Sequence, residues 1–125
     1  MAVVLDAGGL IAVDRVDRKV GAILRVAQQE NIPVRTSAAV VAQVWRSGSR
    51  QANLARVLTG IDVAALDVQA GRSVGEVLAL SQSADVVDGH LGFIVRSGDT
   101  VLTSDTNDMK KILSARGVGA TLRRV

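Results

Sequence analysis

The chain of 125 residues contains no cysteine, one histidine, one proline and only two aromatic residues, Trp45 and Phe93. Without cysteine, disulfide bonds and thiolate metal sites are excluded, so a metal ion would have to be bound by oxygen atoms or by His90. With so few aromatic rings, the stacking array by which many proteins hold single-stranded nucleic acid is excluded as well. We interpret Trp45 as a core or partner-facing side chain.

The sequence also lacks a long apolar run and a basic leader segment. No apolar stretch approaches the ~20 residues of a membrane span, and the first residues do not have the pattern of a secretion signal. We therefore expect a cytoplasmic protein without membrane contact. The net charge is +3, and arginines (12) far outnumber lysines (3). This balance suits phosphate binding, but it equally suits a GC-rich genome, which favours arginine codons.

What the chain does contain is a regular alternation of two kinds of apolar segment. Short apolar runs predict strands, and apolar residues spaced three and four apart predict helices. This order predicts a single α/β domain over residues 1–125, with three layers and a central, mostly parallel sheet of four to five strands flanked by helices. The expected strands cover residues 2–5, 32–35, 61–66, 100–103 and 120–125, and the expected helices residues 17–29, 37–47, 50–58, 68–81, 85–96 and 106–116.

Two of the predicted buried strands are followed by aspartates, Asp6 and Asp105. In open parallel sheets, ligands collect outside the carboxyl ends of the strands, so we expect these two carboxylates to lie close together. Asp88, near the start of a predicted helix, is a third candidate, and Asp85 and Asp108 lie near these in the sequence. Several carboxylates at one place are the ligand type that Mg²⁺ and Mn²⁺ prefer, and metal-assisted phosphodiester hydrolysis uses such a group.

Helix capping is the alternative explanation for these acids. Asp85 precedes Asp88 by three residues, and Asp105 precedes Asp108 by three, as in an N-cap followed by an anion in the first helical turn. Asp6 is harder to explain in this way, because we predict a tight turn and no helix at the Gly-Gly pair that follows it. His90 is interpreted as a core residue, since at ~100° per residue it points away from Asp88.

Four segments, taken in order, resemble a known family. LDAGGLIA, TSAAVVAQVWRSGSRQANLARVL, ADVVDGHLGFIV and VLTSDTNDMKKIL are similar to the PIN-domain ribonucleases of the VapC toxin type, and together they span nearly the whole chain. The resemblance implies a sandwiched parallel sheet, acidic residues that bind Mg²⁺ or Mn²⁺, cleavage of single-stranded RNA, and neutralisation by an antitoxin that lies across the active site.

Carried over by position, the resemblance makes Asp6, Asp88 and Asp105 the catalytic and metal-binding residues, with Asp108 as a supporting metal ligand. Asp85 and Gln43 are weaker candidates for the metal. The family usually has a glutamate where this chain has Gln43, so the acidic set is one charge short. Thr103 or Ser104 is expected to hydrogen-bond a ligand or a phosphate.

Three functions remain open at this point. The first is a metal-dependent endoribonuclease, the toxin of a type II toxin–antitoxin pair, with a cognate antitoxin, an RNA substrate and a second copy of the chain as partners. The second is a catalytically weakened or silent PIN-like domain that binds RNA or an antitoxin without efficient cleavage. The third is a receiver-like switch domain, although the chain lacks the paired acids and the late lysine of that class. A basic rim for RNA would comprise Arg15, Arg46 and Arg50, with Arg18 and Arg96, although each arginine taken alone is better explained as a solvated helix residue.

Overall fold

In the computed structural model, which describes all residues from 1 to 125, a five-stranded parallel sheet forms the centre of the molecule. The strand order is β3-β2-β1-β4-β5, and all four neighbouring pairs run parallel. The predicted three-layer α/β domain is thereby confirmed, with a sheet that is parallel throughout. The strands are β1 (Val3–Leu5), β2 (Val34–Ser37), β3 (Asp62–Ala64), β4 (Thr100–Thr103) and β5 (Thr121–Arg124).

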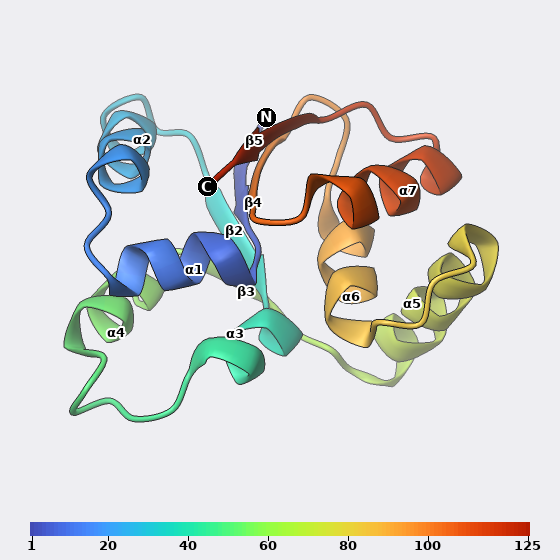
Figure 1. The fold of residues 1–125 in the computed structure, drawn as a ribbon, viewed down its shortest axis with the longest axis horizontal. Helices are drawn as coiled ribbons and strands as arrows, with labels where there is room; N and C mark the ends of the chain where they lie inside the picture. Colours follow the sequence, from blue (N-terminus) through green and yellow to red (C-terminus); the bar gives the residue numbers. More distant parts are fainter.

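Helices cover both faces of this sheet, which Figure 1 shows nearly edge-on. On one side lie the second, first and fourth helices, and on the other lie the last three (Figure 1). The third helix lies beyond the lower end of the sheet in this view and contacts both α1 and α6 (Figure 1). The helices are α1 (Ala7–Asp14), α2 (Arg18–Gln29), α3 (Ala38–Val44), α4 (Ala52–Leu58), α5 (Val68–Ser81), α6 (Val86–Ile94) and α7 (Thr106–Arg116).

The middle strand β1 is buried along its whole length, because it lies between two layers of helices. Its Leu5 is paired with Leu102 of β4, and both side chains are fully buried. At the end of β1 the Thr36 hydroxyl donates a hydrogen bond of 2.7 Å to the Leu5 carbonyl, so the carboxyl ends of β1 and β2 are joined by a buried side chain. A continuous apolar run in the sequence is what such a doubly covered strand requires.

The structure corrects the prediction for the residues after β1. Residues Ala7–Asp14 form the helix α1, where the sequence predicted only a tight turn. Gly8 and Gly9 both lie inside this helix, and a Cβ atom at Gly8 would stand 2.7 Å from the Cβ of Ser104. Gly8 is therefore needed because the backbone of α1 approaches the end of β4 closely, and not because the chain turns.

The strand order also places the expected ligand site. The order reverses between β1 and β4, and in open α/β sheets ligands bind outside the carboxyl ends of the strands at such a switch point. Receiver domains have the order 2-1-3-4-5, so the observed order excludes that alternative. None of the seven helices has the length and apolar content required to cross a membrane.

Candidate functional site

Asp6 lies at the carboxyl end of β1 and is 8% exposed. Its carboxylate caps helix α1 by accepting a hydrogen bond of 3.0 Å from the Gly9 N–H. Capping therefore accounts for Asp6 too, contrary to the expectation from the sequence. Burial raises the pKa of Asp6, although hydrogen bonds from the Thr103 hydroxyl and from the backbone of Gly9, Ser104 and Gly8 act against this shift. An ionised Asp6 therefore repels other anions and attracts a cation.

Asp105 follows β4 in the same way and caps α7 by accepting a hydrogen bond of 3.2 Å from the Asp108 N–H. The charge of Asp105 is the largest influence on Asp108 and raises its pKa, while Lys111 acts in the opposite direction. The two acids thus form a pair at the mouth of the site, and both are exposed.

Asp85 caps α6 by accepting a hydrogen bond of 3.0 Å from the Asp88 N–H, which leaves the carboxylate of Asp88 free of any cap. Burial is the first cause that raises the pKa of Asp88 to about 6, and the charges of the other four acids add to it. Those acids are Asp85, Asp108, Asp6 and Asp105, in order of influence. Residues from the starts of α1, α6 and α7 therefore act on one half-buried carboxylate. The acids thus cap helices and also act on one another, so helix capping does not exclude a shared binding site.

The position of Asp88 depends on how α6 is held between its neighbours. Gly92 of α6 packs so closely on Ile112 of α7 that a Cβ atom at Gly92 would collide with the isoleucine side chain. At the same C-terminal end of α6, Arg116 donates hydrogen bonds to the carbonyls of Gly92 and Val95 at 2.6 and 2.7 Å. Cations at a helix C-terminus complement its unpaired carbonyls, so α6 is fixed at the end opposite to Asp88.

The donor set suits a hard divalent cation, since it consists of carboxylate oxygens whose mutual repulsion a cation would relieve. The carboxylates do not stand in a coordinating arrangement, because no three aspartate, glutamate or histidine side chains come close enough to hold one ion. Asp6, Asp85 and Asp105 are held by their cap hydrogen bonds. Binding of a cation would therefore require rotation mainly of the Asp88 and Asp108 side chains, which do not cap a helix.

The remaining candidates are less closely tied to the acids. Gln43 is an exposed residue of α3, near the end of that helix. Arg46 donates hydrogen bonds to the carbonyls of Ala42 and Trp45, so its guanidinium completes the end of α3. Arg15 follows the far end of α1, about 13.5 Å along the helix from Asp6 at 1.5 Å per residue. Arg50 is exposed in the segment between α3 and α4.

His90 belongs to the core, as its spacing from Asp88 predicted. It is 0% exposed, and neither ring nitrogen has a hydrogen-bond partner of good geometry. Burial lowers the pKa of His90, and the nearby backbone of Ala65 offsets part of this effect. The imidazole is therefore a neutral, poorly satisfied group beneath the site and not a metal ligand.

Sequence reasoning missed Lys111 of α7. Its ammonium group donates a hydrogen bond of 3.3 Å to the Gln82 carbonyl at the end of α5, and its charge reaches Asp108. The spacing could have indicated it, because Asp108 and Lys111 are three residues apart on one helix and such residues are neighbours on the helix surface.

Comparison with known proteins defines the fold more closely. No family model matches the sequence, and no curated protein matches it. Among solved structures, a chain in the crystal structure of VapBC2 from Rickettsia felis bound to a DNA fragment from their promoter superposes with a TM-score of 0.68. The two chains are 14% identical, and the match covers 100% of this chain and 99% of the other. At this identity the likeness concerns the fold alone, and the chain therefore shares its three-layer α/β fold with that chain of the VapBC2 complex.

Proposed function

We propose that the chain is a metal-dependent endoribonuclease and the toxin of a type II toxin–antitoxin pair. The observation that carries this proposal is the convergence of four acids on Asp88, at the switch point of the sheet. Burial first, and then the charges of four other acids, raise the pKa of Asp88 to about 6, so an ionised Asp88 adds to a concentration of negative charge. Such a concentration of charge costs folding energy, and binding a divalent cation would relieve it.

Within this proposal Asp6, Asp88 and Asp105 hold the cation and Asp108 supports them. A bound Mg²⁺ or Mn²⁺ would supply Lewis acidity toward the phosphate and a lowered pKa for the attacking water. Asp6 and Asp105 act as fixed points, since their carboxylates are tied to the helix starts. Asp88 has to release its proton before it accepts a cation, so its raised pKa links cation binding to pH.

The antitoxin partner is supported by a groove on the side of the sheet covered by α1, α2 and α4. The groove has a volume of about 720 Å³ and lies at the amino ends of β2 and β3, so an antitoxin helix bound there would contact the chain away from the acids and not across them. Val16 at its edge is 71% exposed and has a φ of 56°, a left-handed conformation that is costly for a β-branched residue. Strained and exposed apolar residues are typical of binding surfaces. The apolar lining includes Val13, Leu24, Ile32, Val34, Val57 and Ile61.

The proposal includes two further features. A second copy of the chain is a partner, supported by exposed apolar side chains along β3 and the start of α5, at Val63, Leu66 and Val68. The activity belongs in the cytoplasm, where its RNA substrate occurs, and a chain without cysteine suits that compartment.

A silent binding domain is the second candidate function, and two observations favour it. Gln43 stands where the family usually has a glutamate, and no three acids are arranged to hold one ion. In that case the fold and the antitoxin groove would be retained while cleavage is lost. The single substitution Gln43→Glu distinguishes the two functions, because it restores the missing charge without changing the fold.

The test is incubation of the purified protein, freed of any bound antitoxin, with single-stranded and structured RNA in Mn²⁺, Mg²⁺ or EDTA. Asp6→Asn is the inactivating variant, and Asp17→Asn is its matched control, because Asp17 is also an N-cap but belongs to α2. Metal-dependent cutting that only Asp6→Asn abolishes supports the nuclease. Cutting that appears only with Gln43→Glu supports the silent domain. Cutting that persists in EDTA, or in Asp6→Asn, contradicts the proposed metal site.

A further inference from the structure

We call Asp6, Asp85, Asp88, Asp105 and Asp108 the acid cluster. One cationic side chain, Lys111 of α7, acts on it. Asp105, Asp108 and Lys111 follow each other at intervals of three residues from the start of this helix, so the last two are neighbours on its surface. Lys111 is the cation that acts on Asp108. No arginine or other lysine is among the main influences on Asp6, Asp88 or Asp108.

The ammonium group of Lys111 extends from α7 to the C-terminal end of α5, where it is held by a hydrogen bond. It donates to the carbonyl of Gln82 at 3.3 Å, and Gln82 ends α5 in a left-handed conformation with φ 54°. An ammonium has three N–H donors, and this bond uses one of them. Because the side chain is exposed, the other two donors are available to a ligand that crosses from the α5–α6 connection to the first turns of α7.

A substrate phosphate needs such a partner here. The site gathers five aspartates, so an RNA strand that approaches it meets repulsion wherever a cation does not compensate. A divalent ion among the acids would neutralise charge at the scissile phosphate but would leave the adjoining phosphate without a partner. A lysine fixed beside the acids meets this need as a compact point charge.

We infer that Lys111 is a positioning residue for RNA, which binds the phosphate next to the cleaved one and directs the strand between α7 and the α5–α6 connection. This inference rests on the proposed nuclease function. It shifts the entry of RNA away from the expected basic rim at Arg15, Arg46 and Arg50, of which Arg46 is already engaged with the end of α3.

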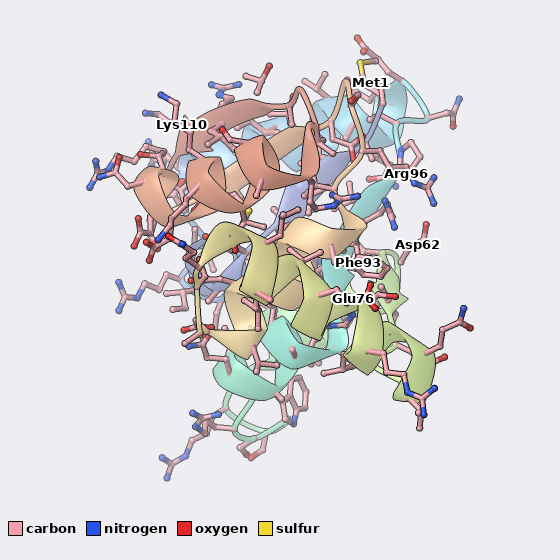
Figure 2. The ribbon with its side chains drawn as sticks, turned by 90° about the vertical axis from the view of Figure 1, so that its right-hand side faces the viewer. Met1, Asp62, Glu76, Phe93, Arg96 and Lys110 are labelled. Atoms are coloured by element: carbon pink, nitrogen blue, oxygen red, sulfur yellow. The ribbon has the colours of Figure 1, made fainter.

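Lys110 provides a matched control. It is the preceding residue, it is exposed, and in Figure 2 it projects from α7 on the side away from α5. Lys110→Gln and Lys111→Gln therefore remove the same charge from the same helix, but only Lys111→Gln also removes the hydrogen bond to the Gln82 carbonyl and the charge beside Asp108. Lys111→Arg keeps the charge and tests whether a cation at this position suffices.

The experiment measures binding of a fluorescein-labelled single-stranded RNA of about 12 nucleotides by anisotropy, over a range of salt concentrations. It uses the non-cleaving Asp6→Asn background with Mg²⁺ present, and cleavage rates are measured in the wild-type background. We expect Lys111→Gln to weaken binding about three- to tenfold and to reduce the slope of log affinity against log salt by ~0.7, the value for one phosphate contact with a single strand. Lys110→Gln should leave the slope unchanged, and Lys111→Arg should restore it.

The cleavage data add a second readout. Loss of a positioning contact should raise KM more than it lowers kcat, which a mere loosening of α5 against α7 would not produce. Equal salt slopes for Lys110→Gln and Lys111→Gln, in a parent protein that cleaves RNA, would overturn the role of Lys111 and leave the nuclease function standing. A wild-type protein that neither binds nor cleaves RNA would overturn both.

Discussion

The hydroxyl group of Thr103 interacts with both acids that follow the central strands: it accepts a hydrogen bond from the Asp105 N–H at 3.0 Å, and it lowers the pKa of Asp6 against the effect of burial. Thr103 is 0% exposed, so water does not take the place of this hydroxyl. One buried side chain therefore acts on the backbone of Asp105 and on the charge of Asp6. Groups of this kind, which orient the ligands of a metal without touching it, often matter nearly as much as the ligands.

The first prediction concerns this hydroxyl. Thr103→Val removes the hydroxyl at nearly constant volume, should raise the pKa of Asp6 further, and is expected to weaken Mn²⁺ binding about tenfold or more. Thr103→Ser retains the hydroxyl and should bind Mn²⁺ as the wild type does. Titration calorimetry measures both affinities, while urea unfolding records any general loss of stability. Equal Mn²⁺ affinity in the wild type and Thr103→Val would show that the hydroxyl has no bearing on the metal.

The second prediction follows from the pKa of Asp88, which is raised to about 6 from an ordinary value of 3.8. Between these two values the native state binds more protons than the unfolded state, so the free energy of unfolding falls as the pH rises from about 4 to about 6. Above that range the native protein carries the full cost of the charge. Because Asp88 is only half-buried, solvent screening reduces this cost to about 1 kcal/mol.

Asp88→Asn should therefore stabilise the metal-free protein by about 1 kcal/mol at pH 7 and weaken the dependence of its stability on pH between 4 and 6. Urea unfolding across this range measures both effects. Asp62→Asn, at an exposed acid of β3 on the edge of the sheet, serves as the control and should change neither. A loss of stability in Asp88→Asn at pH 7 would mean that the carboxylate is a stabilising group.

The third prediction concerns Gln43. A carboxylate in its place adds one charge toward a cation at the acids, worth about 1 kcal/mol at ~4 Å in a water-like medium and ~4 kcal/mol at an effective dielectric of 20. Gln43→Glu should thus raise Mn²⁺ affinity by about ten- to a thousandfold, and nuclease activity should rise with it. Gln29→Glu adds the same charge at the end of α2 and is the control. If calorimetry finds the same affinity for both variants, Gln43 does not face the metal.

The fourth prediction concerns His90, whose ring nitrogens are buried without good partners. Replacement by an apolar side chain removes the cost of burying them, so His90→Leu is expected to stabilise the protein by about 1–2 kcal/mol. The lowered pKa of His90 means that the native state resists protonation, and the wild type should lose stability as the pH falls below about 6.5. The advantage of His90→Leu should accordingly be larger at pH 5 than at pH 7.5 in urea unfolding. A destabilised His90→Leu protein would indicate a hidden polar partner.

The sequence predicted the sheet and the gathering of acids for physical reasons that are easy to state. A strand covered by helices on both faces is mostly apolar, so the end of an apolar run in the sequence marks the carboxyl end of the strand. Asp6 and Asp105 were therefore placed at neighbouring strand ends, and the structure confirms this placement. The position of Asp88 relative to them was expected only from the family resemblance; burial is the main cause of its raised pKa, and the charges of Asp6 and Asp105 make the smallest of the named contributions.

Other features depend on contacts between segments far apart in the sequence. Helix α1 was missed because its apolar residues show no helical periodicity and two glycines stand at its start, while Asp6, its cap, was assigned only to the site. The close approach of Gly8 to Ser104 and the bond from Lys111 to Gln82 join residues about 96 and 29 positions apart. No local pattern contains such information, because it arises only once the layers pack.

Three of the acids at this site, Asp6, Asp85 and Asp105, each hold the first turn of a helix. Asparagine caps a helix about as well as aspartate does, whereas alanine does not. Mutations to asparagine therefore remove the chemistry and keep the fold, while mutations to alanine weaken three helix starts together with the site. If the proposed nuclease function holds, an inactive relative that keeps this fold is therefore expected to carry asparagine, and not alanine, at these three positions.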